Sequence, residues 1–269
     1  MQIMLIQNSP VLGAKSRNLA ALTETIGKSQ SDLLLLPELF ATGYYFESRD
    51  QVSELAEEIS GGTTIDWMVD LASASGGLVC GGLVERAGDD IYNSAVIVNA
   101  DGPVLTYRKI HLFFEESRWF TPGNRPPEVY QHGAIYLGLM ICFDWRFPEV
   151  ARSLSLQGAQ ILLHPANLVQ SYCQDAMVTR SLENGVYTAT ANRIGSDTKT
   201  TGESLIFTGR SQVTSPQGEI LARASQVDTE VISIELEPEL ARDKAVTQYN
   251  HLLNDRQPWA YQEITDNRN

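Results

Sequence analysis

The chain has few of the residues that define several protein classes. Only 3 of its 269 residues are cysteine and 4 are histidine, and no two of them stand at the spacing of a zinc site. This sparse set argues against a disulfide-bonded secreted domain. The longest apolar stretches, residues 33–36 and 137–143, are far shorter than the roughly 18 residues that a membrane span needs. We expect no metal, no cofactor and no transmembrane segment.

Positive charge is also scarce. The chain has 20 Lys and Arg against 33 Asp and Glu, a formal net charge of −13, which disfavours nucleic acid and anionic membranes as partners. The first residues, 1–7, carry no basic leader and only a short apolar run, which is untypical of a signal peptide. Together with the sparse cysteines, this predicts a cytoplasmic protein, in which one cysteine can be a nucleophile.

Strands and helices alternate along the sequence, with hairpins at two places. The run 33–36 is apolar throughout and ends at Pro37, which is typical of a central strand buried on both faces. Turn signals at 99–102 and 215–218 predict two hairpins. Strand–helix units are expected at 135–157 and 161–184, followed by a strand at 187–191. Without repeats or linkers, the pattern predicts one α/β domain over 1–269, with a mixed sheet covered by helices.

Cys142 is the most informative residue of the chain. It ends the apolar run 135–141, and Pro148 behind it suits the first turn of a helix. A strand-to-helix turn presents its side chain at the carboxyl end of a strand, and the following backbone N–H groups can hold an oxyanion. A buried structural cysteine is the common alternative, but polar Asp144 and Arg146 beside Cys142 argue against it.

Two further residues follow other predicted strands. Glu38 comes directly after the strand at 33–36, and Lys109 follows a strand at 104–107. Taken singly, Glu38 could be structural and Lys109 could lie on the surface. Together with Cys142 they supply a nucleophile, a proton carrier and a cation for an oxyanion, which are the three functions that amide chemistry requires.

The segments around these residues resemble the signatures of the nitrilase superfamily of carbon–nitrogen hydrolases. They read LLPELF (35–40), YRKIHLF (107–113) and ICFDWRFPE (141–149). The separations of 71 residues from Glu38 to Lys109 and 33 from Lys109 to Cys142 also fit, and the likeness extends through 183–187 and 209–219. The resemblance therefore covers nearly the whole chain.

The resemblance implies an α-β-β-α sandwich that pairs with a second subunit into a larger layered assembly. It implies a cofactor-free triad of Glu38, Lys109 and Cys142. A further glutamate lines the site in many members, six residues before a Pro-Gly, and Glu116 rather than Glu115 has that offset from 122–123. Around the triad we expect substrate-binding residues at these positions: Tyr44, Phe113, Phe143, Trp145 and Asn167.

The expected reaction is hydrolysis of a non-peptide amide to an acid and ammonia through a thioester on Cys142. Nitrilases of this superfamily usually have Trp-Glu after the cysteine, whereas Phe143 and Asp144 follow here, which favours amides. A nitrilase, an N-carbamoyl amino acid hydrolase and an acyl transferase stay open as alternatives. A catalytically silent binding protein is disfavoured because the triad is complete. Cys80 is expected in the core, whereas an exposed position is open to Cys173, which we expect in a loop.

The C-terminal tail, 249–269, follows the last expected strand at 231–236 and is rich in Leu and aromatic residues. Apolar side chains in a free tail are unfavourable in water. We expect a homodimer or a higher homo-oligomer, with Trp259 or Tyr261 buried against the partner or against the chain's own sheet. The alternative is that the tail packs back on its own domain, above all through Leu252 and Leu253.

Overall fold

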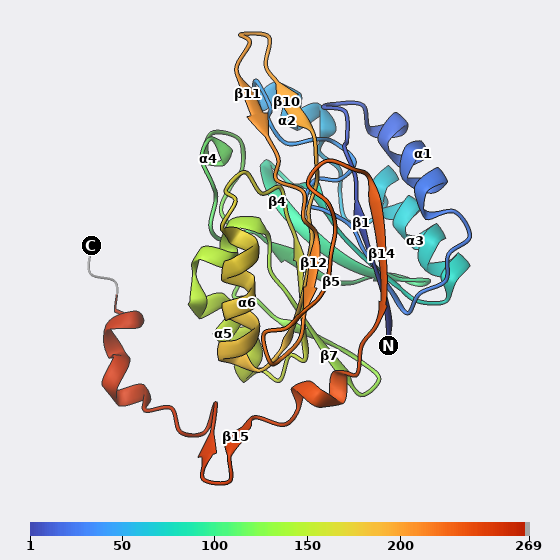
Figure 1. Cartoon of the computed structure of the whole chain (residues 1–269). Helices are drawn as coiled ribbons and strands as arrows, with labels where there is room; N and C mark the ends of the chain where they lie inside the picture. Colours follow the sequence, from blue (N-terminus) through green and yellow to red (C-terminus); the bar gives the residue numbers. More distant parts are fainter. Residues whose placement is uncertain (267–269) are drawn as a thin grey trace.

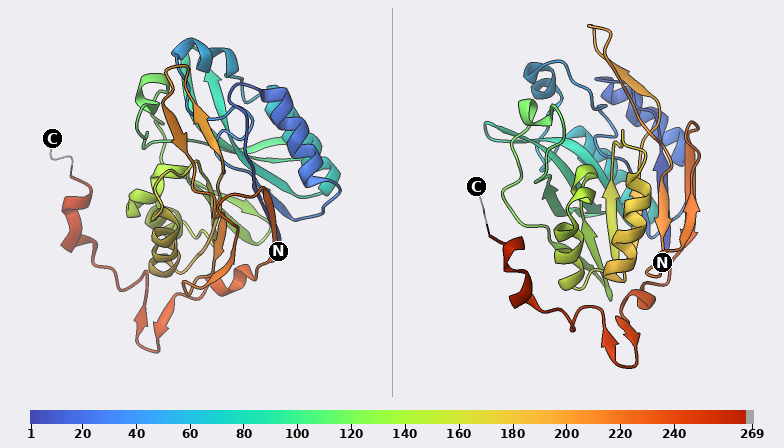
Figure 2. Two further views of the ribbon diagram at one scale, coloured as in Figure 1. Left: turned by 45° about the horizontal axis from the view of Figure 1, so that its top comes forward. Right: turned by 60° about the vertical axis from the view of Figure 1, so that its left-hand side comes forward.

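Two six-stranded sheets lie against one another between outer layers of helices in the computed structural model, which describes residues 1–266 (Figure 1). This arrangement is the α-β-β-α sandwich that the family resemblance implies. The helices α1 (Lys15–Ile26) and α3 (Thr63–Ser75) cover one sheet, and α5 (Pro148–Leu156) and α6 (Cys173–Asn184) cover the other (Figure 2).

The first sheet contains the N-terminal half of the chain and one strand from the C-terminal part. Its strand β1 pairs in parallel with β2, and β2 pairs in parallel with β3, while the remaining pairs are antiparallel. In spatial order the strands are β14 (Glu230–Glu235), β1 (Gln2–Gln7), β2 (Leu33–Leu35), β3 (Leu78–Ala87), β4 (Asp90–Asn99) and β5 (Gly102–Arg108).

The second sheet has a parallel centre, β7–β8–β9, flanked by antiparallel strands. Its spatial order is β13 (Ile220–Arg223), β12 (Gln212–Thr214), β9 (Tyr187–Ala191), β8 (Ile161–Pro165), β7 (Ile135–Leu139) and β6 (Val129–His132). The carboxyl ends of β7 and β8 lie side by side, and such an edge is where α/β sites form.

Alternation along the central strands builds two cores. Ile3 and Leu5 of β1 face the space between the sheets, whereas Met4 and Ile6 face the helices α1 and α3. The run 33–36 alternates in the same way, so both faces of β2 are buried as expected. Burying each such side chain contributes roughly 1.5–3 kcal/mol, so a polar replacement on either face would be strongly destabilising.

Shorter elements connect these layers. They are the helices α2 (Arg49–Leu55) and α4 (Glu116–Trp119), the 3₁₀ turns η1 (Cys142–Arg146), η2 (Pro238–Ala241) and η3 (Pro258–Ile264), and the hairpins β10 (Ser196–Thr198) with β11 (Ser204–Ile206) and β15 (Ala245–Thr247) with β16 (Asn250–His251). Within residues 1–266 no helix is both long and apolar enough to cross a bilayer.

Most expected elements are present, with some differences. The strand beginning at Leu78 continues to Ala87, because it pairs with all of β4. The strand at 231–236 is not the last, since the hairpin β15–β16 follows it. Cys173 is buried as the first residue of α6, so the option of an exposed cysteine there is wrong.

The C-terminal tail extends away from the body of the chain (Figure 1). Trp259 is 73% exposed, so its burial against the chain's own sheet is wrong. Leu252 and Leu253 are half-buried, and the Leu252 N–H donates to the carbonyl of Lys244 at 2.8 Å. The tail therefore packs back through Leu252 and Leu253, and farther along the half-buried Tyr261 lines a pocket with Arg152 of α5 rather than lying against a sheet. The residues 267–269 of the predicted interface tail lie outside the described residues.

Candidate active site

Cys142 stands at a strained turn directly after β7. Its φ is +39°, a value that a residue with a Cβ adopts only when its surroundings enforce it. The backbone N–H of Ile141 donates to Asp144 at 2.9 Å, and this carboxylate also accepts from the Tyr107 hydroxyl at 2.9 Å. His111 contacts the same carboxylate through Nδ1 at 2.8 Å. Asp144 thus ties the turn to the opposite sheet.

A histidine that the sequence did not single out fixes the carbonyl of Cys142. His164 on β8 is fully buried, and burial lowers its pKa, so its ring is neutral at pH 7. Its Nε2 lies 2.9 Å from the Cys142 carbonyl oxygen and its Nδ1 lies 3.0 Å from the Thr190 hydroxyl. The proton therefore belongs on Nε2, which donates to Cys142, while Nδ1 accepts from Thr190.

Three charged side chains from the first half of the chain meet beside this turn. The Lys109 Nζ lies 2.7 Å from Oε1 of Glu38 and 2.7 Å from Oε1 of Glu116. All three side chains are almost wholly buried. The second Glu116 oxygen accepts from the Phe113 N–H at 3.0 Å. The choice of Glu116 over Glu115 is consistent with this geometry, since Glu115 instead pairs with Arg118 at 2.9 Å.

Asn93 is a further member of this cluster that sequence reasoning missed. Its Nδ2 donates to Oε1 of Glu38 at 2.7 Å, and its carbonyl accepts from the Lys109 N–H at 2.9 Å. Asn93 lies inside a mostly apolar strand, so no sequence motif distinguishes it from the neighbouring core residues. Close packing also matters here: a Cβ at Gly82 would lie 2.7 Å from the Cα of Glu38, so β3 can pass Glu38 only with glycine.

Burial and mutual charge set the protonation of the cluster. Burial alone lowers the pKa of Lys109, but the carboxylates of Glu116 and Glu38 outweigh it and raise the pKa above its ordinary value. Burial raises the pKa of Glu116 to about 7 against the opposing effect of Lys109. Burial and the charge of Glu38 also raise the pKa of Cys142. The resting nucleophile is therefore a thiol, and its proton must move when it reacts.

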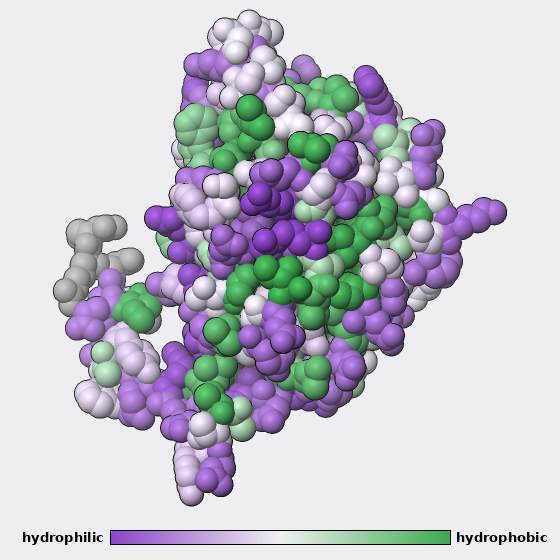
Figure 3. Space-filling model, in the orientation of Figure 1, coloured by the Kyte–Doolittle hydropathy of each residue, from purple (hydrophilic) through white to green (hydrophobic). Residues whose placement is uncertain are grey.

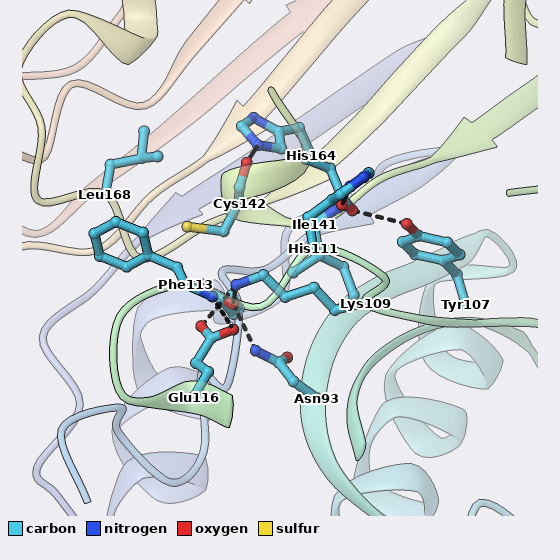
Figure 4. Close-up of polar contacts among 12 residues, drawn as sticks. Asn93, Tyr107, Lys109, His111, Phe113, Glu116, Ile141, Cys142, His164 and Leu168 are labelled. Carbon is cyan, nitrogen blue, oxygen red and sulfur yellow. Dashed lines mark hydrogen bonds and ion pairs between the residues drawn. The ribbon is translucent and has the colours of Figure 1, made fainter. Parts of the chain in front are cut away.

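Figure 4 shows the Cys142 sulfur, the Lys109 ammonium and the Glu116 carboxylate directed toward one space beside the Phe113 ring. A narrow cleft opens here and brings together four of the five predicted substrate-binding residues with Cys142: Phe113, Phe143, Trp145 and Asn167. The Phe113 and Phe143 rings lie 5.0 Å apart, centre to centre. Leu168 and Val169, which the sequence did not indicate, complete the apolar wall.

Several buried polar atoms at the site have no hydrogen-bond partner among residues 1–266. They are both amide atoms of Asn167, the Oε2 of Glu38 and the hydroxyl of Tyr44. Burial and the charges of Glu116 and Glu38 raise the pKa of Tyr44, so its hydroxyl stays protonated close to the cluster. Buried polar atoms are normally paired, so these are free to bind a substrate.

The other two cysteines are buried in the core and do not line the cleft beside Cys142. Cys80 is fully buried between the sheets, as expected, and burial raises the pKa of its thiol. Within the described part of the chain, no three His, Cys, Asp or Glu side chains are grouped so that they could hold a metal ion.

Comparisons with known proteins agree with this architecture. The carbon–nitrogen hydrolase family matches residues 4–245. A nitrilase from Pyrococcus abyssi (strain GE5 / Orsay) is 40% identical over 263 residues, or 97% of this chain and 98% of that protein. The carbon–nitrogen hydrolase of Helicobacter pylori G27 has a TM-score of 0.86 and 25% identity over 98% of this chain and 97% of its own. A variant of the amidase from Nesterenkonia sp. AN1 has a TM-score of 0.75 and 26% identity over 91% and 96% of the two chains.

These matches define a hydrolase that acts on carbon–nitrogen bonds other than peptide bonds. The chain belongs to the carbon–nitrogen hydrolase family, within the nitrilase superfamily.

Proposed function

We propose that this enzyme hydrolyses small, uncharged carboxamides to the acid and ammonia through a thioester on Cys142. The observation that carries the proposal is the buried Lys109 ammonium, held at 2.7 Å by both Glu38 and Glu116 beside a strained cysteine. The three side chains have complementary tasks in acyl transfer: Cys142 is the nucleophile, Glu38 moves protons and Lys109 stabilises negative charge.

In the first step Glu38 accepts the proton of the Cys142 thiol while the sulfur attacks the amide carbon. The Oε2 of Glu38 has no other partner within residues 1–266 and can take this proton. The carbon–sulfur bond forms as the carbonyl π electrons move onto oxygen. The Lys109 ammonium and the N–H of Phe143, the second residue of η1, stabilise this oxyanion, because the first N–H groups of a helical turn have no intrahelical acceptor.

Collapse of this intermediate breaks the carbon–nitrogen bond. Glu38 returns the proton to the leaving nitrogen, so ammonia departs and a thioester remains on Cys142. A water molecule then gives a proton to Glu38 and attacks the thioester carbon, and the acid is released as the thiol recovers its proton. Glu116 touches neither step directly; it holds Lys109 and the Phe113 backbone in place.

The cleft supports an uncharged acyl group. None of the described residues that line it beside Cys142 carries a charge: its walls are aromatic and aliphatic, with the neutral amides of Asn167 and Gln170. The carboxylate of an N-carbamoyl amino acid would therefore lack a cation there. The free amide of Asn167 can both donate to and accept from a polar group of the substrate. In the related Nesterenkonia amidase variant, acrylamide, a small uncharged amide, adds to the active-site cysteine.

A nitrile is the second candidate substrate, because the relative from Pyrococcus abyssi is named a nitrilase. The same groups could attack a nitrile carbon, and Lys109 would then face a developing nitrogen anion. Ammonia release from matched pairs, such as propionamide with propionitrile and benzamide with benzonitrile, separates the two. Higher kcat/KM for the amides supports the proposal, and higher kcat/KM for the nitriles refutes it. Mass spectrometry of quenched enzyme detects the acyl group on Cys142.

We further propose a cytoplasmic homodimer in which the tail contributes to the interface. Apolar side chains gather on the face that bears α6, β12 and β14 (Figure 3). Exposed apolar residues of these elements include Leu182 of α6 and Val231 of β14. Trp259 in the tail is also exposed, and a partner subunit would cover it. Light scattering of the full chain and of a chain ending at residue 253 tests this: an unchanged dimer after truncation refutes the role of the tail, and a monomeric full chain refutes the dimer.

A further inference from the structure

An arginine–aspartate pair is fully buried outside the catalytic cluster. Arg193 follows β9, and Asp197 lies in β10. The guanidinium donates from Nη1 to Oδ2 at 2.8 Å and from Nη2 to Oδ1 at 3.0 Å, so the two groups meet in the bidentate arrangement. A buried pair of this kind is expensive to desolvate and is often no more stable than apolar packing. We therefore expect a role of this ion pair other than stabilising the fold.

The carboxylate of this pair also binds one short segment of backbone. The Oδ2 of Asp197 also accepts from the N–H groups of Tyr44 at 2.9 Å and Tyr45 at 3.1 Å. Arg193 lies over the ring of Phe207 at 3.9 Å, and that ring meets the ring of Tyr44 edge-on at 6.0 Å. The pair thus holds Tyr44 twice, by its backbone through Asp197 and by its ring through Phe207.

Tyr44 stands at the end of a tight turn that begins just after Glu38. The N–H groups of Thr42 and Gly43 both donate to the carbonyl of Leu39 at 3.1 Å, which closes the turn. Tyr44 shares an apolar cluster with Val169, a residue of the cleft wall. Its hydroxyl is buried beside the Glu116 carboxylate but makes no hydrogen bond of good geometry within residues 1–266. A donor kept unpaired in this place is available to the substrate.

We propose that the Arg193–Asp197 pair is a positioning unit that fixes Tyr44 so that its hydroxyl hydrogen-bonds the carboxamide of the substrate. Asp197 touches no substrate atom in this arrangement and acts only through Tyr44. A charged acceptor suits the task, because two backbone N–H groups and a guanidinium converge on one carboxylate and leave it a single orientation. The inference rests on the proposed amidase activity for its substrate class.

A double-mutant cycle of Asp197→Asn and Tyr44→Phe tests the proposal, with kcat and KM measured for propionamide. Tyr44→Phe removes only the hydroxyl and should lower kcat/KM about 10- to 100-fold, the range for a hydrogen bond to a polar or charged group. Asp197→Asn should lower it about 10-fold in the otherwise unchanged chain, but less than about 2-fold in the Tyr44→Phe chain. Equal losses in both backgrounds overturn the proposal, because a merely structural role would be independent of the hydroxyl.

Two further variants keep the cycle decisive. Glu85→Gln is the matched control, since Glu85 is buried and binds Arg108 at 3.0 Å and 3.1 Å without touching Tyr44; its effect should be the same with and without the Tyr44 hydroxyl. Where Asp197→Asn does not fold, Phe207→Leu replaces it in the same cycle, because it removes the ring contact and leaves the ion pair. Additive Phe207→Leu and Tyr44→Phe losses would then overturn the proposal.

Failure of the amidase function is recognisable separately. It would appear as no ammonia release by the unaltered chain from any amide. The cycle is then measured with iodoacetamide, which carries the same carboxamide: the Cys142 thiol gives its proton to Glu38, the sulfur bonds to the methylene carbon and iodide leaves. Coupling between Asp197 and Tyr44 in this alkylation rate supports the positioning unit, and additive effects overturn it.

Discussion

Glu38→Gln is the sharpest test of the catalytic assignment, because the substitution changes one property of the site. The two hydrogen bonds that Oε1 of Glu38 accepts, from Asn93 and from Lys109, both at 2.7 Å, can be kept by the amide oxygen. The amide nitrogen takes the place of Oε2, the atom assigned to the moving proton. Shape and packing are preserved, and the capacity to take up a proton is lost.

The expected loss follows from the number of proton transfers assigned to this oxygen. A positioned general acid or base typically contributes about 10²- to 10⁴-fold, and Glu38 acts in both acylation and deacylation. We therefore expect kcat to fall by the upper end of this range, about 10⁴-fold, which corresponds to an increase of about 5 kcal/mol in the activation free energy. Folding should change little, because the substitution removes one negative charge from a buried cluster that has two carboxylates and only one ammonium. We expect the free energy of unfolding to change by less than about 2 kcal/mol.

Stopped-flow measurement of ammonia release gives the rates of both steps, and urea titration gives the free energy of unfolding. Glu57→Gln is the control, because this half-buried carboxylate also pairs with a lysine, Lys15 at 3.2 Å, far from the cleft. It should leave kcat unchanged. A Glu38→Gln enzyme that retains kcat within 10-fold of the unaltered enzyme would refute the assignment and make Glu116 the candidate base.

Other variants test the remaining parts of the site. Cys142→Ala should remain folded and lose about a million-fold in kcat, measured as ammonia release. Because the pKa of Glu116 is raised from 4.5 to about 7 in the folded chain, the folded state binds more protons between these values, so the free energy of unfolding should fall as pH rises from 4.5 to 7; urea titration should show a smaller fall in Glu116→Gln. His164→Leu leaves the Cys142 carbonyl without its donor and should cost about 1–3 kcal/mol of stability by the same titration. Cys80→Ala should lower the melting temperature while kcat stays within about 2-fold.

The fold could be predicted well where one local pattern decides the outcome. The apolar run at 33–36 and the turn signals at 99–102 mark elements that are present in the structure. The length of β3 could not be predicted, because it depends on pairing with β4 across the whole strand. Exposure of Cys173 was also misjudged: the residue begins a helix packed on the second sheet, and helix starts near a loop give no sign of burial.

The candidate site shows the same division. Glu38, Lys109 and Cys142 each end a strand within a distinctive segment, so the sequence indicates them. Asn93, His164 and Asp197 lie within strands and gain their roles only through contacts with residues far along the chain. An example is the 2.9 Å bond that the Tyr44 N–H donates to Asp197 across 153 positions. No local pattern encodes such a contact.

The reacting groups are divided between the two sheets. Glu38 and Lys109 follow strands of the first sheet, and Cys142 follows a strand of the second. A sheet that forms alone during folding therefore holds either the thiol or its proton acceptor, never both. The first sheet is itself completed only by β14, which comes late in the chain. We expect a newly made chain to stay chemically inert until nearly all of it has been synthesised and the sheets have joined, which protects unfinished chains from forming a thioester prematurely.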